Sequence, residues 1–350
     1  MAQKRALVTQ SSRRRLGQRL VLAANSLLVA CATRSASTGA PATQPRDTPA
    51  VPGGTAAQRG PGRWRSLAPV PTPRSEVAAA AVQRSILLVG GFVQNGGVSN
   101  AAEEYDVSAD RWRPRASLPK PLHHPAAAAL DRRLFVAGGF DERGAPVADL
   151  WEFEPAADRW IARAPMPSPR GALALVALDG RHYAVGGVGP GGDVGANEAY
   201  DPVADRWTRL RPMPTARDHL AAAAVRGRLY VIGGRIGGFD RNLDRNEVYD
   251  PQSDSWALRR PMPTARSGIA AAAAGERIYV FGGESPSKTF NETEEYDPAT
   301  DAWAARAAMP VARHGLAAVT VDGTISVLAG GRTPGLSVSG LHEAFTPDVG

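Results

Sequence analysis

The segment RLYVIGGRIGGFDRNLDRNEVYDPQSDSW, residues 228–256, contains two short apolar runs, a Gly-Gly pair and two aromatic residues seven positions apart. Short runs bounded by Gly, Pro and Asp are typical of β-strands. Tyr249 and Trp256 flank the dipeptide Asp250-Pro251, and a Pro in second place presets the backbone of a tight turn. The segment therefore predicts a hairpin that carries one aromatic side chain on each arm.

The same arrangement returns along the chain with a period near 48 residues. Gly-Gly pairs stand at 90–91, 138–139, 186–187, 233–234, 282–283 and 330–331. The aromatic pairs are Tyr105/Trp112, Phe153/Trp160, Tyr200/Trp207, Tyr249/Trp256 and Tyr296/Trp303. A repeat of this length indicates a solenoid or a propeller.

Each repeat begins with a run rich in small side chains, such as HLAAAAV at 219–225. Alanine alone favours helix, but Arg226 and Gly227 end this run too early for a stable isolated helix. The innermost strands of a propeller converge on its axis, where only small side chains fit. We therefore expect strands at these Ala-rich runs.

The Gly-Gly pair, the Glu-x-Tyr-Asp-Pro sequence and the following Trp resemble the signature of kelch repeats. The resemblance covers about residues 62–348 and implies an all-β, six-bladed kelch β-propeller with four strands in each blade. Trp64 has no aromatic partner upstream, and Phe345 has no Trp downstream. We expect the strand around Trp64 to complete the last blade and close the ring, within a propeller domain at 62–350.

Residues 1–30 have the pattern of an export signal. Six basic residues and no acidic ones precede or flank the apolar run LVLAANSLLVA at 20–30, which is too short to span a bilayer but suits a signal-peptide core. Leu28-Val29-Ala30-Cys31 resembles the lipobox of bacterial lipoproteins, which implies lipidation at Cys31; the alternative is an ordinary secretory signal. An Asp after this cysteine would indicate retention in the inner membrane of a Gram-negative cell. Ala32 stands there instead, which leaves anchoring in the outer membrane as an alternative. We expect a lipid-anchored protein of the bacterial cell envelope.

The remaining composition limits the partners. Residues 31–61 are rich in Ala, Thr, Ser, Pro and Gly, which predicts a flexible linker. Outside the signal, 35 basic residues balance 34 acidic ones without a basic block, so nucleic-acid binding is not expected. Cys31 is the only cysteine, so there is no internal disulfide.

One arginine recurs where the innermost strand begins. It stands at Arg74, Arg170, Arg217, Arg266 and Arg313, and the second blade has Leu122 instead. In kelch propellers such arginines can line the mouth of the central pocket, where planar guanidiniums suit carboxylates or acidic sugars. The alternative is structural pairing with the Glu that recurs two residues before the aromatic residue.

Departures from the repeat are the sharper functional clues. Glu76, His124 and His219 occupy the second place after the arginine position, where other blades have Ala or Gly. A histidine beside a carboxylate, as in Asp218-His219, can exchange protons near neutral pH. We include these three residues with the five arginines as candidate ligand-binding residues.

The sequence contains no convincing catalytic set. Galactose-oxidase-like kelch enzymes need a Cys crosslinked to Tyr beside copper, and the propeller has no Cys. We therefore expect no cofactor and no metal, and we expect a binding or interaction protein for an anionic glycan, an acidic peptide or a protein partner. The alternative is an enzyme on acidic sugars, similar to the kelch sialate mutarotases.

Overall fold

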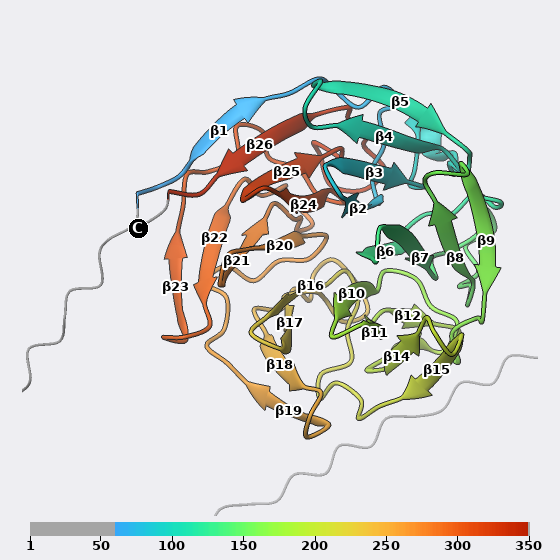
Figure 1. The fold of residues 1–350 in the computed structure, drawn as a ribbon. Helices are drawn as coiled ribbons and strands as arrows, with labels where there is room; N and C mark the ends of the chain where they lie inside the picture. Colours follow the sequence, from blue (N-terminus) through green and yellow to red (C-terminus); the bar gives the residue numbers. More distant parts are fainter. Residues whose placement is uncertain (1–59, 349–350) are drawn as a thin grey trace, which may run out of the picture. The chain divides into compact units, whose positions relative to one another are not determined.

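The computed structural model describes residues 60–348, and these form a six-bladed β-propeller (Figure 1). The predicted signal, Cys31 and nearly all of the predicted linker lie outside the described residues. Among residues 60–348, no helix is long and apolar enough to cross a bilayer.

Each blade is a four-stranded antiparallel sheet. In order from the axis outward, the first three blades are β2 (Ala78–Val82), β3 (Ser85–Val89), β4 (Ala102–Asp106) and β5 (Arg111–Arg115); β6 (Ala126–Leu130), β7 (Arg133–Ala137), β8 (Leu150–Glu154) and β9 (Arg159–Arg163); and β10 (Ala174–Leu178), β11 (Arg181–Val185), β14 (Asn197–Asp201) and β15 (Arg206–Arg209). The third blade also carries a small hairpin of β12 (Val188–Gly189) and β13 (Gly192–Asp193), and the first a 3-10 turn, η1 (Gln94–Gly96).

The last three blades are β16 (Ala221–Val225), β17 (Arg228–Ile232), β18 (Asn246–Asp250) and β19 (Ser255–Leu258); β20 (Ala270–Ala274), β21 (Arg277–Phe281), β22 (Thr293–Asp297) and β23 (Ala302–Ala305); and β24 (Ala317–Val321), β25 (Thr324–Leu328), β26 (His342–Thr346) and β1 (Arg63–Ser66). The Ala-rich runs are therefore strands, as predicted, and they form the innermost strand of each blade.

The N-terminal strand closes the ring. β1 pairs antiparallel with β26, which places Trp64 opposite Phe345. This confirms the predicted closure, and it covers an edge of the last sheet that would otherwise be open to pairing with another chain.

The tryptophans join neighbouring blades. Six indole N–H groups donate to a carbonyl of an adjacent blade: Trp112 to Ala68, Trp160 to Ala116, Trp207 to Ala164, Trp256 to Arg211, Trp303 to Arg260 and Trp64 to Ala307. That of Trp151 has no hydrogen-bond partner among the described residues. The hydrophobic core lies between the blades, as where Ile232 and Tyr230 of the fourth blade pack with Ile278 and Tyr296 of the fifth. The repeated aromatic residues are thus part of the scaffold.

In the last blade, the structural equivalent of the Gly-Gly pair begins one residue earlier than the sequence pattern indicates. In the first five blades both glycines of the Gly-Gly pair have positive φ, whereas in the sixth Ala329 (φ 57°) and Gly330 (φ 96°) take these two conformations. Gly330 donates to the carbonyl of Arg74, as Gly91 does to that of Leu122. Gly331 therefore occupies the position after the pair, and not its second place.

Candidate functional site

Six equivalent residues form a ring around the propeller axis. They are Glu76, His124, Ala172, His219, Gly268 and Gly315, one from each blade, just before the innermost strand. The N–H of each residue donates to the carbonyl of the equivalent residue in the preceding blade, with distances of 2.7 to 3.0 Å, and the sixth bond closes the circle. The fold therefore holds these six backbones in fixed positions at the centre of the molecule.

The ring has a left-handed backbone at every position. Glu76, His124, Ala172 and His219 have φ of 49–53°, although none of them is glycine. A non-glycine residue in this region costs about 1 to 2 kcal/mol, and such residues cluster at functional sites. The ring thus places Glu76, His124 and His219 at the axis at a cost in folding stability.

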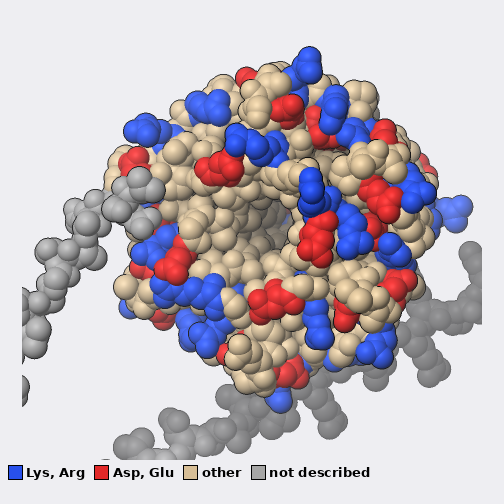
Figure 2. Space-filling view, in the orientation of Figure 1, with Lys and Arg blue, Asp and Glu red and all other residues tan. Residues whose placement is uncertain are grey.

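A cavity of about 180 Å³ is lined by Glu76, His124 and His219 of this ring and by residues of the loops around it. Its walls contain the residues that follow the Gly-Gly pairs, namely Phe92, Phe140, Arg235 and Glu284. Phe239 and Leu336, two of the few exposed large apolar side chains of residues 60–348, lie at its rim. Figure 2 shows one face of the propeller, with a hollow on the axis and acidic and basic side chains interspersed around it.

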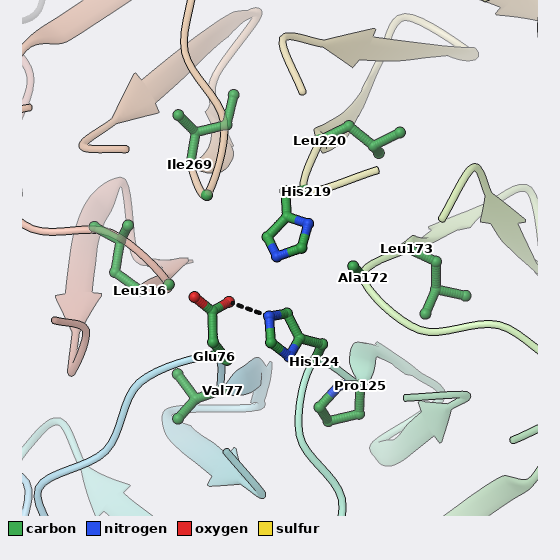
Figure 3. Close-up of a pocket in the computed structure, with 12 residues that line it drawn as sticks. Glu76, Val77, His124, Pro125, Ala172, Leu173, His219, Leu220, Ile269 and Leu316 are labelled. Atoms are coloured by element: carbon green, nitrogen blue, oxygen red, sulfur yellow. Dashed lines mark ion pairs between the residues drawn. The ribbon is translucent and has the colours of Figure 1, made fainter. Parts of the chain in front are cut away.

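Glu76 and His124 point toward each other from neighbouring blades, and the ring of His219 lies across the axis from them (Figure 3). Nε2 of His124 is 3.2 Å from a carboxylate oxygen of Glu76, and Nε2 of His314 is 3.5 Å from the other. Gly315 leaves room for this arrangement, because a Cβ there would lie 2.4 Å from Oε1 of Glu76.

A second set of polar contacts surrounds His219. Its Nδ1 is hydrogen-bonded to Asp218, and its Nε2 accepts from Arg235 at 2.8 Å. Arg235 also donates to Asp218 at 3.2 Å and to Glu284 at 3.0 Å. Since the bond from Arg235 makes Nε2 an acceptor, the proton of this imidazole is on Nδ1 and faces Asp218.

The pocket shifts the ionisation of its own side chains. Burial raises the pKa of the Glu76 carboxyl, against the opposing effect of nearby His314. Burial and neighbouring cationic groups hold the pKa values of His124 and His219 well below the usual range, and burial lowers that of His123 to about 4. At neutral pH these three imidazoles are therefore neutral.

The structure corrects the expectation that the five arginines line the mouth. Arg74, Arg170, Arg217, Arg266 and Arg313 are 0% exposed. Each is paired with the Glu of its own blade: Glu103, Glu198, Glu247, Glu294 and Glu343, respectively. Their guanidiniums also donate to strand carbonyls, as Arg217 does to Gly233 and Val231. These side chains have no surface for a ligand, and the structural alternative describes them.

The three departures from the repeat, in contrast, do come together. Glu76, His124 and His219 all line the axial cavity, although their role in binding remains a prediction. Sequence reasoning missed Arg235 and Glu284. A signal existed: the position after Gly-Gly reads Phe92, Phe140, Val188, Arg235 and Glu284 in the first five blades, and such variation within a repeat marks a surface that is not scaffold.

Comparison with known proteins agrees with this architecture. The sequence model described as the KLHDC2/KLHL20/DRC7 Kelch-repeats domain matches residues 62–234 and 200–345. No curated protein sequence matches the chain. A solved structure titled "Structure of YjhT" is similar with a TM-score of 0.69 and 15% identity, over 79% of this chain and 95% of that one. At this identity the likeness shows the fold alone, whereas the sequence match spans most of the chain and both halves of the ring. The chain therefore belongs to the kelch-repeat family.

Proposed function

We propose that the protein is a binding protein whose site is the axial pocket, and that this pocket takes a positively charged group of a ligand or partner. The observation that carries the proposal is the charge of the pocket. Glu76 and Glu284 supply two carboxyl groups to the cavity, and Arg235 is the one Lys or Arg among the described residues that line it. The carboxylate of Asp218, outside the lining, is paired with Arg235, as is that of Glu284. A positively charged group would offset the excess of carboxyl groups over basic side chains, whereas an anion would add to the negative charge.

The walls support the same ligand class. Phe92, Phe140 and Phe239 border the cavity, and aromatic faces attract cations. An apolar rim over a few convergent polar groups is the usual build of a ligand site. The anionic glycan or acidic peptide expected from the sequence loses its basis, because the arginines that were to bind it are buried.

Paired peptide libraries test this proposal. Two sets of fluorescent peptides would be identical except for a central Lys or Arg in one and a central Asp or Glu in the other. We expect the basic set to bind at least about tenfold more tightly, a difference of about 1.4 kcal/mol. Glu76→Gln and Phe239→Ala should each weaken its binding. Preference for the acidic set, or no binding by either set, would contradict the proposal.

A second candidate is acid–base catalysis on an acidic sugar, of the kind the sialate mutarotases perform. The contact that favours it is Glu76 with His124 at 3.2 Å, since a buried carboxyl and a neutral imidazole can donate and accept protons in one site. We rank this function second because the excess of carboxyl groups in the pocket disfavours an acidic substrate. The test is the anomerisation rate of sialic acid with and without the protein; an unchanged rate excludes it.

The location follows from the sequence alone. We propose that Cys31 carries a lipid and holds the propeller at the bacterial envelope, because a basic region, an apolar core and a lipobox-like sequence succeed one another in residues 1–31. Metabolic labelling with a fatty acid should mark the wild type and not Cys31→Ser. Equal labelling of both would contradict this proposal.

A further inference from the structure

Three side chains of the ring carry metal-ligating atoms that converge on the axis. Glu76, His124 and His219 each offer one such atom, and the three atoms lie within 4.8 Å of one another. They come from the first, second and fourth blades, so the closed backbone ring, not a flexible loop, sets their spacing. Two imidazoles and one carboxylate are a ligand set for Zn²⁺ and for other divalent transition metals.

The Glu76 carboxylate has spare capacity for a ligand. Its oxygens lie 3.2 Å from Nε2 of His124 and 3.5 Å from Nε2 of His314, and within residues 60–348 neither contact is a hydrogen bond. Buried carboxylates normally accept several hydrogen bonds or bind a metal. An oxygen ligand is therefore present and largely unsatisfied at the centre of the cluster.

His314 gives an independent indication. Its side chain is 1% exposed, its Nδ1 has no hydrogen-bond partner within the described residues, and its Nε2 lies 3.5 Å from both Glu76 and Glu284. These three residues form a second group of potential ligands that shares Glu76 with the first. A buried polar side chain normally has a hydrogen-bond partner or binds a metal, so this imidazole, aimed between two carboxylates, is a further potential ligand of a cation.

The surroundings orient the imidazoles as metal sites require. A ligating histidine usually donates its other N–H to a carboxylate or similar acceptor, and Nδ1 of His219 contacts Asp218 in this way. Nδ1 of His124 lies 2.6 Å from Nδ1 of His123, whose ring stacks on Phe92 at 4.2 Å.

We propose that the cation of the axial pocket is a divalent transition-metal ion bound by Glu76, His124 and His219, with Glu284 and His314 at its side. This inference rests on the proposed function, because it names a divalent metal ion, in place of a basic side chain, as the cation that the carboxyl groups bind. Three protein ligands leave a coordination position of the metal free. Phe92 and Phe140 line the same cavity as the three ligands. Arg235 is the competitor, since its guanidinium uses the Nε2 lone pair of His219.

Titration of the metal-free protein with Zn²⁺ tests the inference, with bound metal counted after dialysis. We expect one Zn²⁺ per chain, and affinity that falls about 100-fold or more in Glu76→Gln, His124→Ala and His219→Ala. Asp218→Asn should weaken binding about 10- to 100-fold by releasing His219. Arg235→Gln should act in the opposite direction and tighten binding about tenfold, because it removes a positive charge and frees Nε2.

The control is His182→Leu, which removes a buried histidine in β11 that does not line the cavity. It should bind Zn²⁺ as the wild type does, and melting curves of all variants would show that they are folded. Absence of Zn²⁺ binding, or binding that survives the three ligand substitutions, would overturn the inference. If basic peptides then still bind in the pocket, the proposed function stands and only the metal is wrong.

Discussion

Two sets of charged side chains lie near the axis, and they differ in how they are distributed over the blades. The Arg–Glu pair occurs in five of the six blades and is fully buried, as Arg217 and Glu247 are. The Glu76–His124–His219 cluster occurs once, at ring positions where the other blades have Ala172, Gly268 and Gly315. Repetition thus accompanies the scaffold, and the break in the repeat accompanies the pocket.

The second blade refines this comparison. It has Leu122 in place of the arginine and Trp151 in place of the glutamate, so both members of the pair are replaced together. Leu122 is fully buried. Replacing both partners of a buried ion pair by apolar residues is often neutral, whereas removing one partner leaves an uncompensated charge. The second blade therefore folds without the ion pair. In the other blades, we expect the loss of one partner alone to be strongly destabilising.

Removal of one partner should give the largest effect on stability. Arg217→Ala leaves the Glu247 carboxylate buried without its guanidinium, and it should lower the free energy of unfolding by about 3 to 5 kcal/mol. The double variant Arg217→Leu/Glu247→Trp copies the second blade and should lose less than half as much. Denaturant unfolding measures both. A double variant as unstable as the single one would show that the charge is not the cause.

A histidine outside the pocket should give the next largest effect. His182 stands in β11 where other blades have Leu or Ile, and neither of its ring nitrogens has a hydrogen-bond partner among the described residues. Burial lowers its pKa to about 4, so acidification protonates it in the unfolded chain first. The folded state should then lose about 2 kcal/mol relative to the unfolded state between pH 7 and pH 4.5 from this residue.

His182→Leu restores the side chain of the repeat and checks this sign. The variant should be more stable than the wild type at pH 7 by about 1 kcal/mol, because an unsatisfied buried polar group is removed. The gain should grow as the pH falls from 6.5 toward 4. Unfolding curves over this range measure it, and a gain that shrinks at low pH would mean that the imidazole is protonated in the folded state.

The sequence predicted the fold and part of the pocket for identifiable reasons. The period near 48 residues indicated a solenoid or a propeller, the resemblance to kelch repeats implied six blades, and Trp64 and Phe345 predicted the closing strand. Glu76, His124 and His219 were found because they interrupt the repeat. Pairing of the arginines with the recurring Glu was one of two alternatives, and the sequence could not decide between them, because residue spacing locates Arg217 at a strand end but not the direction of its side chain. Nor could Arg235 and His314 be placed, since loop contacts between blades bring them to the axis.

Two glycines of the ring give the smallest but most selective test. Gly268 (φ 63°) and Gly315 (φ 58°) have nearly the same backbone as Ala172 (φ 53°). Alanine at Gly268 should therefore cost about 1 kcal/mol of stability. Alanine at Gly315 should cost more, because its Cβ would also lie 2.9 Å from the backbone nitrogen of Glu76. Their surroundings differ: a Cβ at Gly268 meets nothing closer than 3.4 Å, whereas at Gly315 it would lie 2.4 Å from Oε1 of Glu76. Gly315→Ala must displace the carboxylate, so it should weaken Zn²⁺ and basic-peptide binding about tenfold, and Gly268→Ala should leave both within about twofold. Equal losses in the two variants would assign the effect to the backbone, and equal retention would mean that the position of Glu76 does not matter for binding.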